Sequence, residues 1–377
     1  MWFFRSPQIV FGPDSLSHLS SLPIHRAAII TDRYLLKTDL PDRVRSSLPE
    51  GADSLTVGDI SAEPPLSEMT ANAERIRGFA PDWFVAVGGG SSIDTAKILF
   101  ALYERPDLTV YDITPLVPLG LRQKSRLVAI PTTSGTGSEC TWAAVLSEEG
   151  EKRKHELASP EILPDYAILD PSLVVSLPPE QTRNTAADAM AHAVEAYGST
   201  WRNPFSDAMA EKALELISTN IDGVMADPGN LEPRNLVHIG ASMAGLSFSN
   251  SQIGLVHAMG HSLGAIFHLP HGKVIGLLLP YVVDFNYDAC PERYDRLNRL
   301  IPTNHREERL SGSLSNILGA MGVARSAKEA GIGEEAYRSN LEPLVALASE
   351  STGMVTNPKD SGSEDLRNIF IRAYSGD

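Results

Sequence analysis

The chain has 377 residues, of which 42% are hydrophobic and 21% are charged, so it is long enough for two globular domains with separate cores. Its net charge of −15 comes without a basic run or a basic face, which argues against nucleic acid or an anionic membrane as a partner. Two cysteines cannot build a disulfide framework, and neither a cleavable leader nor a membrane-length apolar run is visible. We therefore expect a protein of the reducing cytoplasm.

The N-terminal segment, Trp2–Gly12, alternates apolar and polar residues in the manner of a β-strand. Such a strand can pair with its copy across a two-fold axis, where identical contacts close a homodimer. It can equally pair with the chain's own sheet. The residue pattern leaves both arrangements open.

From about residue 26 to 170, short apolar runs alternate with amphipathic ones. The pattern predicts buried strands at 27–32, 83–90, 127–133 and 166–171, with helices at 66–80 and from about residue 93 onward. Strand–helix alternation predicts a parallel sheet covered by helices on both faces. The remaining segments have helical periods and almost no alternation, so we expect an α/β domain over 1–178 and an all-helical domain over 179–377.

Two loops directly after predicted strands have the composition of a nucleotide site. Gly88–Ser92 opens a helix, where glycines let the backbone approach a phosphate and the free N–H groups carry partial positive charge. Residues 131–139 (PTTSGTGSE) offer several hydroxyl groups. Each loop alone is also compatible with a tight or polar turn, and the G-x-G-x-x-G spacing is absent. Asp32 ends the first buried strand, where a carboxylate binds a ribose and repels a 2′-phosphate, which favours NAD over NADP.

Four of the ten histidines lie close together in the second half of the chain, and an Asp-x-x-x-His pair precedes them. Residues four apart share a helix face, so Asp188 and His192 can point at one atom, as can His257 and His261. His271 follows a proline, where we expect that helix to end. Either pair alone is more often a packed core histidine or a chance spacing. Together, one carboxylate and several imidazoles favour a first-row divalent metal.

Four motifs, in this order, resemble those of the iron-containing (group III) alcohol dehydrogenases, a family that includes lactaldehyde/propanediol oxidoreductases and butanol dehydrogenases. They are GGGSSIDTAK (88–97), PTTSGTGSE (131–139), DAMAHAVEAY (188–197) and GLVHAMGHSLG followed by PHG (254–272). The resemblance continues through TNPKD (356–360) and covers essentially the whole chain. It implies a dehydroquinate synthase-like fold, with an α/β dinucleotide-binding domain and an all-α domain. It also implies hydride transfer between a primary alcohol or aldehyde and NAD(H), assisted by Fe²⁺, or by Zn²⁺ or another divalent metal.

The resemblance also implies roles for individual residues. Metal ligands fall on Asp188, His192, His257 and His271, and His261 matches a histidine near the nicotinamide that is a candidate proton carrier. Cofactor positions fall on Asp32, Gly89, Gly90, Ser91, Asp94, Thr132, Thr133, Thr136 and Lys154. Phe248 matches an aromatic residue of the substrate pocket, and Trp142 lies in the region that shapes that pocket.

Other features qualify this assignment. Cys140, Ser262 and His268 depart from the usual family residues without touching an expected ligand. We expect Glu195 behind the ligands or at the surface rather than as a base. The resemblance favours a homodimer, in which the N-terminal strand pairs with its copy in a second chain.

Two alternatives remain. The first is a glycerol dehydrogenase- or dehydroquinate synthase-like enzyme of the same superfamily, against which the one-Asp, three-His ligand set argues. The second is a non-catalytic nucleotide- or metal-binding protein, which is disfavoured because both phosphate loops and all four ligands are present.

Overall fold

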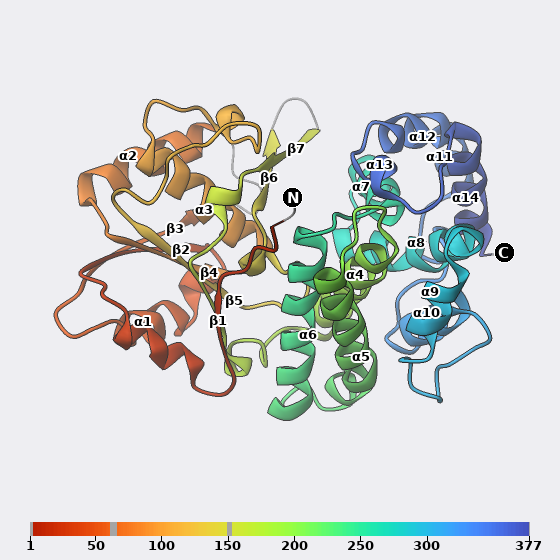
Figure 1. Cartoon of the computed structure of the whole chain (residues 1–377), viewed down its shortest axis with the longest axis horizontal. Coiled ribbons are helices and arrows are strands. Elements are labelled where there is room, and N and C mark those ends of the chain that lie inside the picture. The colour runs from red at the N-terminus through yellow and green to blue at the C-terminus, as the bar shows by residue number, and fades with distance from the viewer. Residues whose placement is uncertain (1–2, 61–65, 149–152, 377) are drawn as a thin grey trace. The chain divides into compact units, whose positions relative to one another are not determined.

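The computed structural model describes residues 3–60, 66–148 and 153–376. The chain divides into two compact units, one of residues 5–174 and one that runs from residue 175 to the C-terminus and includes the segment before residue 5. The first unit is coloured from red to yellow-green in Figure 1, and the second from green to blue. The first is built on a parallel sheet and the second from helices, which confirms the predicted fold class.

The sheet of the first unit has the strand order β1-β8-β5-β4-β2-β3, and every neighbouring pair is parallel. Its strands are β1 (Gln8–Phe11), β2 (Arg26–Asp32), β3 (Asp53–Ile60), β4 (Trp83–Gly88), β5 (Arg126–Pro131) and β8 (Tyr166–Leu169). Because the strands are parallel, their carboxyl ends meet at one edge of the sheet. The loops that follow β2, β4 and β5 therefore lie next to one another.

Helices cover both faces of this sheet, as the buried strands predict. They are α1 (Leu40–Ser46), α2 (Leu66–Phe79) and α3 (Gly90–Glu104). Ile30 and Phe84 share one apolar cluster with residues of α2 and α3. Ile29 and Val85 are adjacent to these residues on the same strands, so their side chains point to the opposite face of the sheet. They belong to a second cluster that contains residues of α1.

Four features of the first unit were not predicted or differ from prediction. β1 pairs in parallel with β8 of its own sheet, the arrangement that the residue pattern had left open. β3 is an edge strand whose side chains are mostly half-exposed, so it lacks the apolar run that marks β2 and β4. The hairpin of β6 (Ala143–Glu148) and β7 (Arg153–Ala158) forms a separate antiparallel ribbon. The helix expected near residue 93 already begins at Gly90, because Gly89 is its N-cap.

Eleven α-helices are described in the second unit. Their bounds are α4 (Pro179–Gly198), α5 (Pro204–Ala226), α6 (Leu231–Ser249), α7 (Leu255–Phe267), α8 (His271–Asn286), α9 (Pro291–Asn298), α10 (Leu310–Ala320), α11 (Glu334–Ser339), α12 (Leu341–Ser349), α13 (Gly353–Thr356) and α14 (Ser363–Ser375). Short 3-10 turns are also described in both units. They lie at Ser15–Ser21, Leu35–Lys37, Val110–Asp112, Ser138–Cys140, Pro160–Ile162, Pro171–Leu173 and Tyr287–Ala289.

α4 is the central helix of this unit and packs against α5, α6 and α8. Every residue from 186 to 198 is buried, and alanines make up much of that stretch. Small side chains let the neighbouring helices approach closely, so polar groups on α4 are removed from bulk water. Within the described parts of the chain, no helix is long and apolar enough to cross a membrane.

Candidate active site

Asp188 and His192 lie one turn apart on the buried part of α4. Nε2 of His192 is 3.9 Å from Oδ1 of Asp188, and the two side chains are only 6% and 3% exposed. A spacing of four residues on a helix directs both groups to the same side. α4 thus carries a buried carboxylate next to an imidazole.

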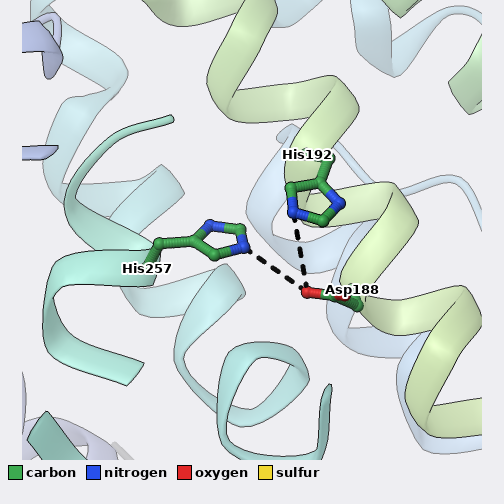
Figure 2. A group of neighbouring side chains, drawn as sticks. All are labelled: Asp188, His192 and His257. Carbon is green, nitrogen blue, oxygen red and sulfur yellow. Dashed lines mark ion pairs between the residues drawn. The ribbon is translucent and has the colours of Figure 1, made fainter. Parts of the chain in front are cut away.

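Two further histidines reach the same carboxylate oxygen from other helices. His257 lies in the first turn of α7, and its Nε2 is 3.4 Å from Asp188 Oδ1. His271 is the first residue of α8, and its Nε2 is 3.3 Å from the same atom. Figure 2 shows the rings of His192 and His257 turned toward Asp188 from two different helices. Three imidazole nitrogens therefore surround one carboxylate oxygen.

The expected position of His271 at the end of a helix is corrected by the structure. α7 ends at Phe267, with His268 in the left-handed conformation as its C-cap. Pro270 then precedes a new helix, α8, in which His271 occupies the first position. A proline is unfavourable inside a helix but fits directly before one, and this places His271 at the start of α8.

The chemistry of this cluster fits a divalent metal ion. Among the described residues, Oδ1 of Asp188 and Nε2 of His257 are buried and lack a well-aligned hydrogen bond. Such atoms are costly in a protein interior unless something binds them. The ligand atoms of Asp188, His192 and His257 all lie within 4.8 Å of one another. His271 lies outside that group of three, and its 36% exposed side chain is on the accessible side of the cluster.

The cluster also shifts the pKa values of its members. Burial acts to raise the pKa of Asp188, but the histidines around it hold that pKa well below its ordinary value. Burial acts to lower the pKa of His257, whereas the carboxylates of Glu195 and Asp188 raise it to about 10. An ionised carboxylate is therefore present at the centre, and a cation in contact with it is strongly favoured.

Aromatic stacking fixes the ring of His192. The Phe248 ring on α6 lies 4.2 Å from it at an angle of 20°, and the His257 ring lies 4.6 Å from it at 16°. Phe248, expected in the substrate pocket, thus packs directly on an expected metal ligand. The contact limits the orientations that His192 can adopt.

His261 lies one helical turn beyond His257 and is half-buried. Its ring centroid is 5.9 Å from that of His257 and 5.2 Å from that of His271. It is not among the three residues whose ligand atoms converge within the described part of the chain. It therefore lies beside the cluster, next to both His257 and His271.

Glu195 lies behind His257, which is one of the two positions that the sequence left open for it. Its Oε2 accepts a very short hydrogen bond from Nδ1 of His257, and its Oε1 accepts one of 2.6 Å from the backbone N–H of Val256. The signal was present in the sequence, because Asp188, His192 and Glu195 are spaced to share one face of α4.

In the first unit, the sheet order brings the two predicted nucleotide loops together. The loop after β4 lies between those after β5 and β2, as the strand order requires. A Cβ atom placed on Gly90 would lie 2.9 Å from both Cγ2 and Oγ1 of Thr136, and one on Gly89 would lie 3.4 Å from Thr133. The glycines therefore let the loop after β4 lie directly against the hydroxyl-rich loop after β5.

Asp32 lies at the end of β2 beside the same glycine loop. Its Oδ1 accepts the backbone N–H groups of Tyr34 and Leu35, each at 2.9 Å. Its Oδ2 accepts a 3.1 Å hydrogen bond from the Ser92 hydroxyl. A fixed negative charge is thus placed at the carboxyl edge of the sheet.

Asp94 and Lys97 on α3 hold the hydroxyl-rich loop in place. The two oxygens of Asp94 accept hydrogen bonds from the Ser138 hydroxyl and from the Val145 N–H, the latter at 3.0 Å. Lys97 is fully buried and donates to Ser138 Oγ (3.0 Å), Thr141 Oγ1 (2.9 Å) and the carbonyl of Ala143 (2.7 Å). Burial lowers the pKa of Lys97, while the carboxylates of Asp94 and Glu139 oppose that shift. Lys97 ends the GGGSSIDTAK motif but was not among the predicted site residues.

The remaining expected residues are distributed as follows. Ser91 is exposed at the start of α3, and Thr132 is buried at the end of β5. Trp142 is half-buried just before β6. The side chain of Lys154, on β7, lies outside the described residues.

Comparison with known proteins identifies the family. Residues 6–171 match the model of the iron-containing alcohol dehydrogenases, and residues 182–374 match the model of the C-terminal part of that family. The chain is 33% identical over 384 residues to an NADPH-dependent butanol dehydrogenase of Clostridium saccharobutylicum, covering 100% of this chain and 98% of the relative. The chain belongs to the iron-containing alcohol dehydrogenase family.

Solved structures of similar proteins agree with this membership. An iron-containing alcohol dehydrogenase from Thermococcus thioreducens has a TM-score of 0.90 and 32% identity, with all of both chains covered. A sulfoacetaldehyde reductase from Bifidobacterium kashiwanohense, solved with NAD⁺, has a TM-score of 0.89 and 26% identity, again with all of both chains covered. The chain spans only 46% of a longer relative, the aldehyde-alcohol dehydrogenase 2 of Entamoeba histolytica.

The family confirms the predicted class of activity. The chain is an alcohol/aldehyde oxidoreductase, and iron and a nicotinamide dinucleotide are the cofactors expected of an iron-containing alcohol dehydrogenase. The structure adds a cluster whose unsatisfied buried ligand atoms suit the metal.

Proposed function

We propose that this protein oxidises a primary alcohol or reduces the corresponding aldehyde, using NAD(H) and an Fe²⁺ ion held by Asp188, His192, His257 and His271. The observation that carries the proposal is the convergence of three Nε2 atoms on the single oxygen Asp188 Oδ1. This donor set would also accept Zn²⁺, and family membership favours iron. Residues 1–178 would provide the nucleotide site and residues 179–377 the metal site.

The protein's own residues each supply one part of the chemistry. When bound, the divalent ion acts as a Lewis acid that makes an alcohol oxygen easier to deprotonate, or an aldehyde carbonyl easier to reduce. Asp188 contributes the negative charge, and its burial excludes water that would compete for the cation. His271 lies on the exposed side of the cluster, so substrate would approach from there. His261, 5.2 Å from His271 between ring centroids, would carry the proton to or from solvent.

NAD is proposed as the cofactor in preference to NADP. One relative is named for its NADPH dependence and a structural neighbour was solved with NAD⁺, so the family alone does not decide. Asp32 supports NAD for this chain, because its carboxylate at the end of β2 would repel a 2′-phosphate and accept a ribose hydroxyl. Gly89, Gly90, Ser91, Thr132, Thr133, Thr136 and Lys154 would complete the cofactor contacts. Asp94 would act by holding the hydroxyl-rich loop through Ser138 and Val145.

We propose Phe248 and Trp142, each within its own unit, as residues that contact the substrate. For Phe248 the support is its stacking on His192, which puts an apolar ring beside a proposed ligand. For Trp142 the support is its half-buried position two residues after the 3-10 turn that Lys97 holds.

We also propose a homodimer in a reducing compartment such as the cytoplasm. β1 lies at an edge of its sheet and ends in Phe11, whose side chain is 63% exposed, so an apolar edge is available for a second copy. Both cysteines, Cys140 and Cys290, are unpaired thiols, which suits a reducing environment.

The metal assignment is tested with His271→Ala and a matched control, His268→Asn. His268 is an exposed histidine three residues away, and asparagine tolerates its left-handed backbone. Both proteins are reconstituted anaerobically with Fe²⁺, and metal content and NADH absorbance are measured with short-chain alcohols and aldehydes. We expect His271→Ala to lose bound metal and most of its activity, while His268→Asn retains both. Full activity with stoichiometric iron in His271→Ala would contradict the assignment.

A further inference from the structure

Glu195 uses both carboxylate oxygens on one short stretch of α7. One oxygen accepts from Nδ1 of His257 and the other from the N–H of Val256, the residue before it. The Glu195 side chain is 5% exposed and that of His257 is 2% exposed. Neither oxygen is left over to exchange a proton with a substrate, so Glu195 does not have the geometry of a general base.

The contact with Glu195 keeps the hydrogen on Nδ1 of His257 when the ring is neutral, as it must be to bind a metal. An ionised carboxylate only accepts hydrogen bonds, so Nδ1 must be the donor. In a neutral imidazole the other nitrogen, Nε2, then has a free lone pair. That atom is the one 3.4 Å from Asp188 Oδ1. We propose that Glu195 is a positioning residue that selects the metal-binding tautomer of His257 and fixes the ring and the backbone that carry it.

The start of α7 shows that Glu195 also positions the backbone. The N-cap residue Gly254 provides no side-chain acceptor, so the first N–H groups of α7 need partners from elsewhere. Glu195 supplies one to Val256, and Asn357 supplies the other, a 3.4 Å bond from Leu255 N–H. A Cβ atom on Gly254 would lie 3.1 Å from Glu195 Oε1 and 3.3 Å from Asn357 Oδ1, so glycine permits this close approach.

Asn357 is itself held rigidly. Its side-chain amide exchanges two hydrogen bonds of 2.8 Å with the amide of Asn286 at the end of α8. Its Nδ2 also donates to the carbonyl of Lys359 at 2.8 Å. The turn that carries His257 is thus fixed from α4, α8 and the segment after α13, which leaves its imidazole little freedom to rotate.

A carboxylate behind a ligating histidine also strengthens the metal bond. Electron density from the carboxylate makes the imidazole a better donor, and loss of such a partner typically lowers metal affinity about 10- to 100-fold. This inference rests on the proposed metal site. It adds that Glu195 sets the affinity of the site without touching the metal or the substrate.

The test is Glu195→Gln, which keeps the volume and removes one of the two acceptors. A glutamine oxygen can serve either Val256 N–H or His257 Nδ1, and its NH₂ group then faces the other. Facing Nδ1, it stabilises the tautomer that has hydrogen on Nε2 and cannot bind metal. We expect the dissociation constant for Zn²⁺, measured by competition with a chelator, to rise about 10- to 100-fold.

Glu104→Gln is the matched control. Glu104 is a buried carboxylate of the other unit, 4% exposed, that likewise only accepts hydrogen bonds, among them those from the N–H groups of Gln123, Lys124 and Ser125. Its substitution should lower thermal stability and leave Zn²⁺ affinity at the wild-type value. If Glu195 had only a structural role, Glu195→Gln would also lower thermal stability and leave Zn²⁺ affinity at the wild-type value.

The outcomes separate this inference from the proposed function. If the wild-type chain binds Zn²⁺ and Glu195→Gln binds it within a factor of two as tightly, the positioning role is refuted and the metal site stands. If the wild-type chain binds no Zn²⁺, the metal site itself fails.

Should Glu195→Gln not fold, NMR of the zinc-loaded wild-type protein with ¹⁵N-labelled histidine rings decides. A protonated Nδ1 on His257, assigned by its loss in His257→Gln, supports the proposal, and an unprotonated one overturns it.

Discussion

Gly90→Ala should weaken cofactor binding, because the added methyl group would separate the two nucleotide loops. The new Cβ would lie 2.9 Å from Cγ2 and Oγ1 of Thr136, whereas ordinary contacts begin at 3.4 Å. Thr136 would have to retreat by about 0.5 Å. Its loop resists that movement, since Thr136 Oγ1 accepts from Ser138 N–H and Ser138 is bonded in turn to Asp94 and Lys97.

The magnitude follows from two opposing contributions. Overpacking of this kind costs about 1–3 kcal/mol. Replacing glycine by alanine in a helix returns up to about 1 kcal/mol. With the middle of each range, about 2 kcal/mol lost and about 0.5 kcal/mol returned, the net cost is about 1.5 kcal/mol, which corresponds to a factor of about 5–30 in an equilibrium constant. For a unit of this size we expect Tm to fall by about 2–8 °C.

The assay measures KM and kcat for NAD⁺ at saturating alcohol, and a thermal melt measures Tm. We expect KM to rise about 5- to 30-fold with a smaller change in kcat, because the ligands on α4, α7 and α8 are untouched. Gly78→Ala on α2 is the control, since a Cβ there meets nothing within 4 Å. It should leave KM unchanged and raise stability by up to about 1 kcal/mol. An unchanged KM and Tm in Gly90→Ala would refute the close-approach argument.

Two further predictions concern cofactor choice and assembly. Asp32→Asn keeps an acceptor for the N–H groups of Tyr34 and Leu35 but removes the charge, so kcat/KM with NADP should rise about tenfold or more, about 1.4 kcal/mol. Equal use of both cofactors by the wild-type protein would show that Asp32 does not face the 2′ position. Phe11→Asp, or removal of residues 1–12, should convert the dimer to a monomer in light scattering, because charge on the edge of β1 blocks pairing. A monomeric wild-type protein, or a dimer unchanged by either alteration, would count against the role of β1.

The sequence by itself determined the features that depend on local pattern. The apolar runs that became β2, β4, β5 and β8 predicted the parallel sheet, because strands buried on both faces need continuous apolar side chains. The four-residue spacing of Asp188 and His192 predicted that they share one side of a helix. Four motifs together predicted the family, and its models match both parts of the chain.

Features that lack a local pattern were decided only by the tertiary structure. β3 and the β6–β7 hairpin have no continuous apolar run, so their pairing depends on neighbours distant in the chain. The start of a second helix at His271, and not the end of the first, became visible only with the backbone in place.

The metal cluster shows the same division most clearly. Periodicity could align Asp188 with His192, but it could not show that His257 and His271 reach the same oxygen from two other helices. It also could not show that Glu195 bonds Nδ1 of His257 and so turns Nε2 toward Asp188. The tautomer of a histidine is set by whatever contacts its second nitrogen, and that contact spans 62 residues of sequence here. Only the packing of α4 against the start of α7 determines it.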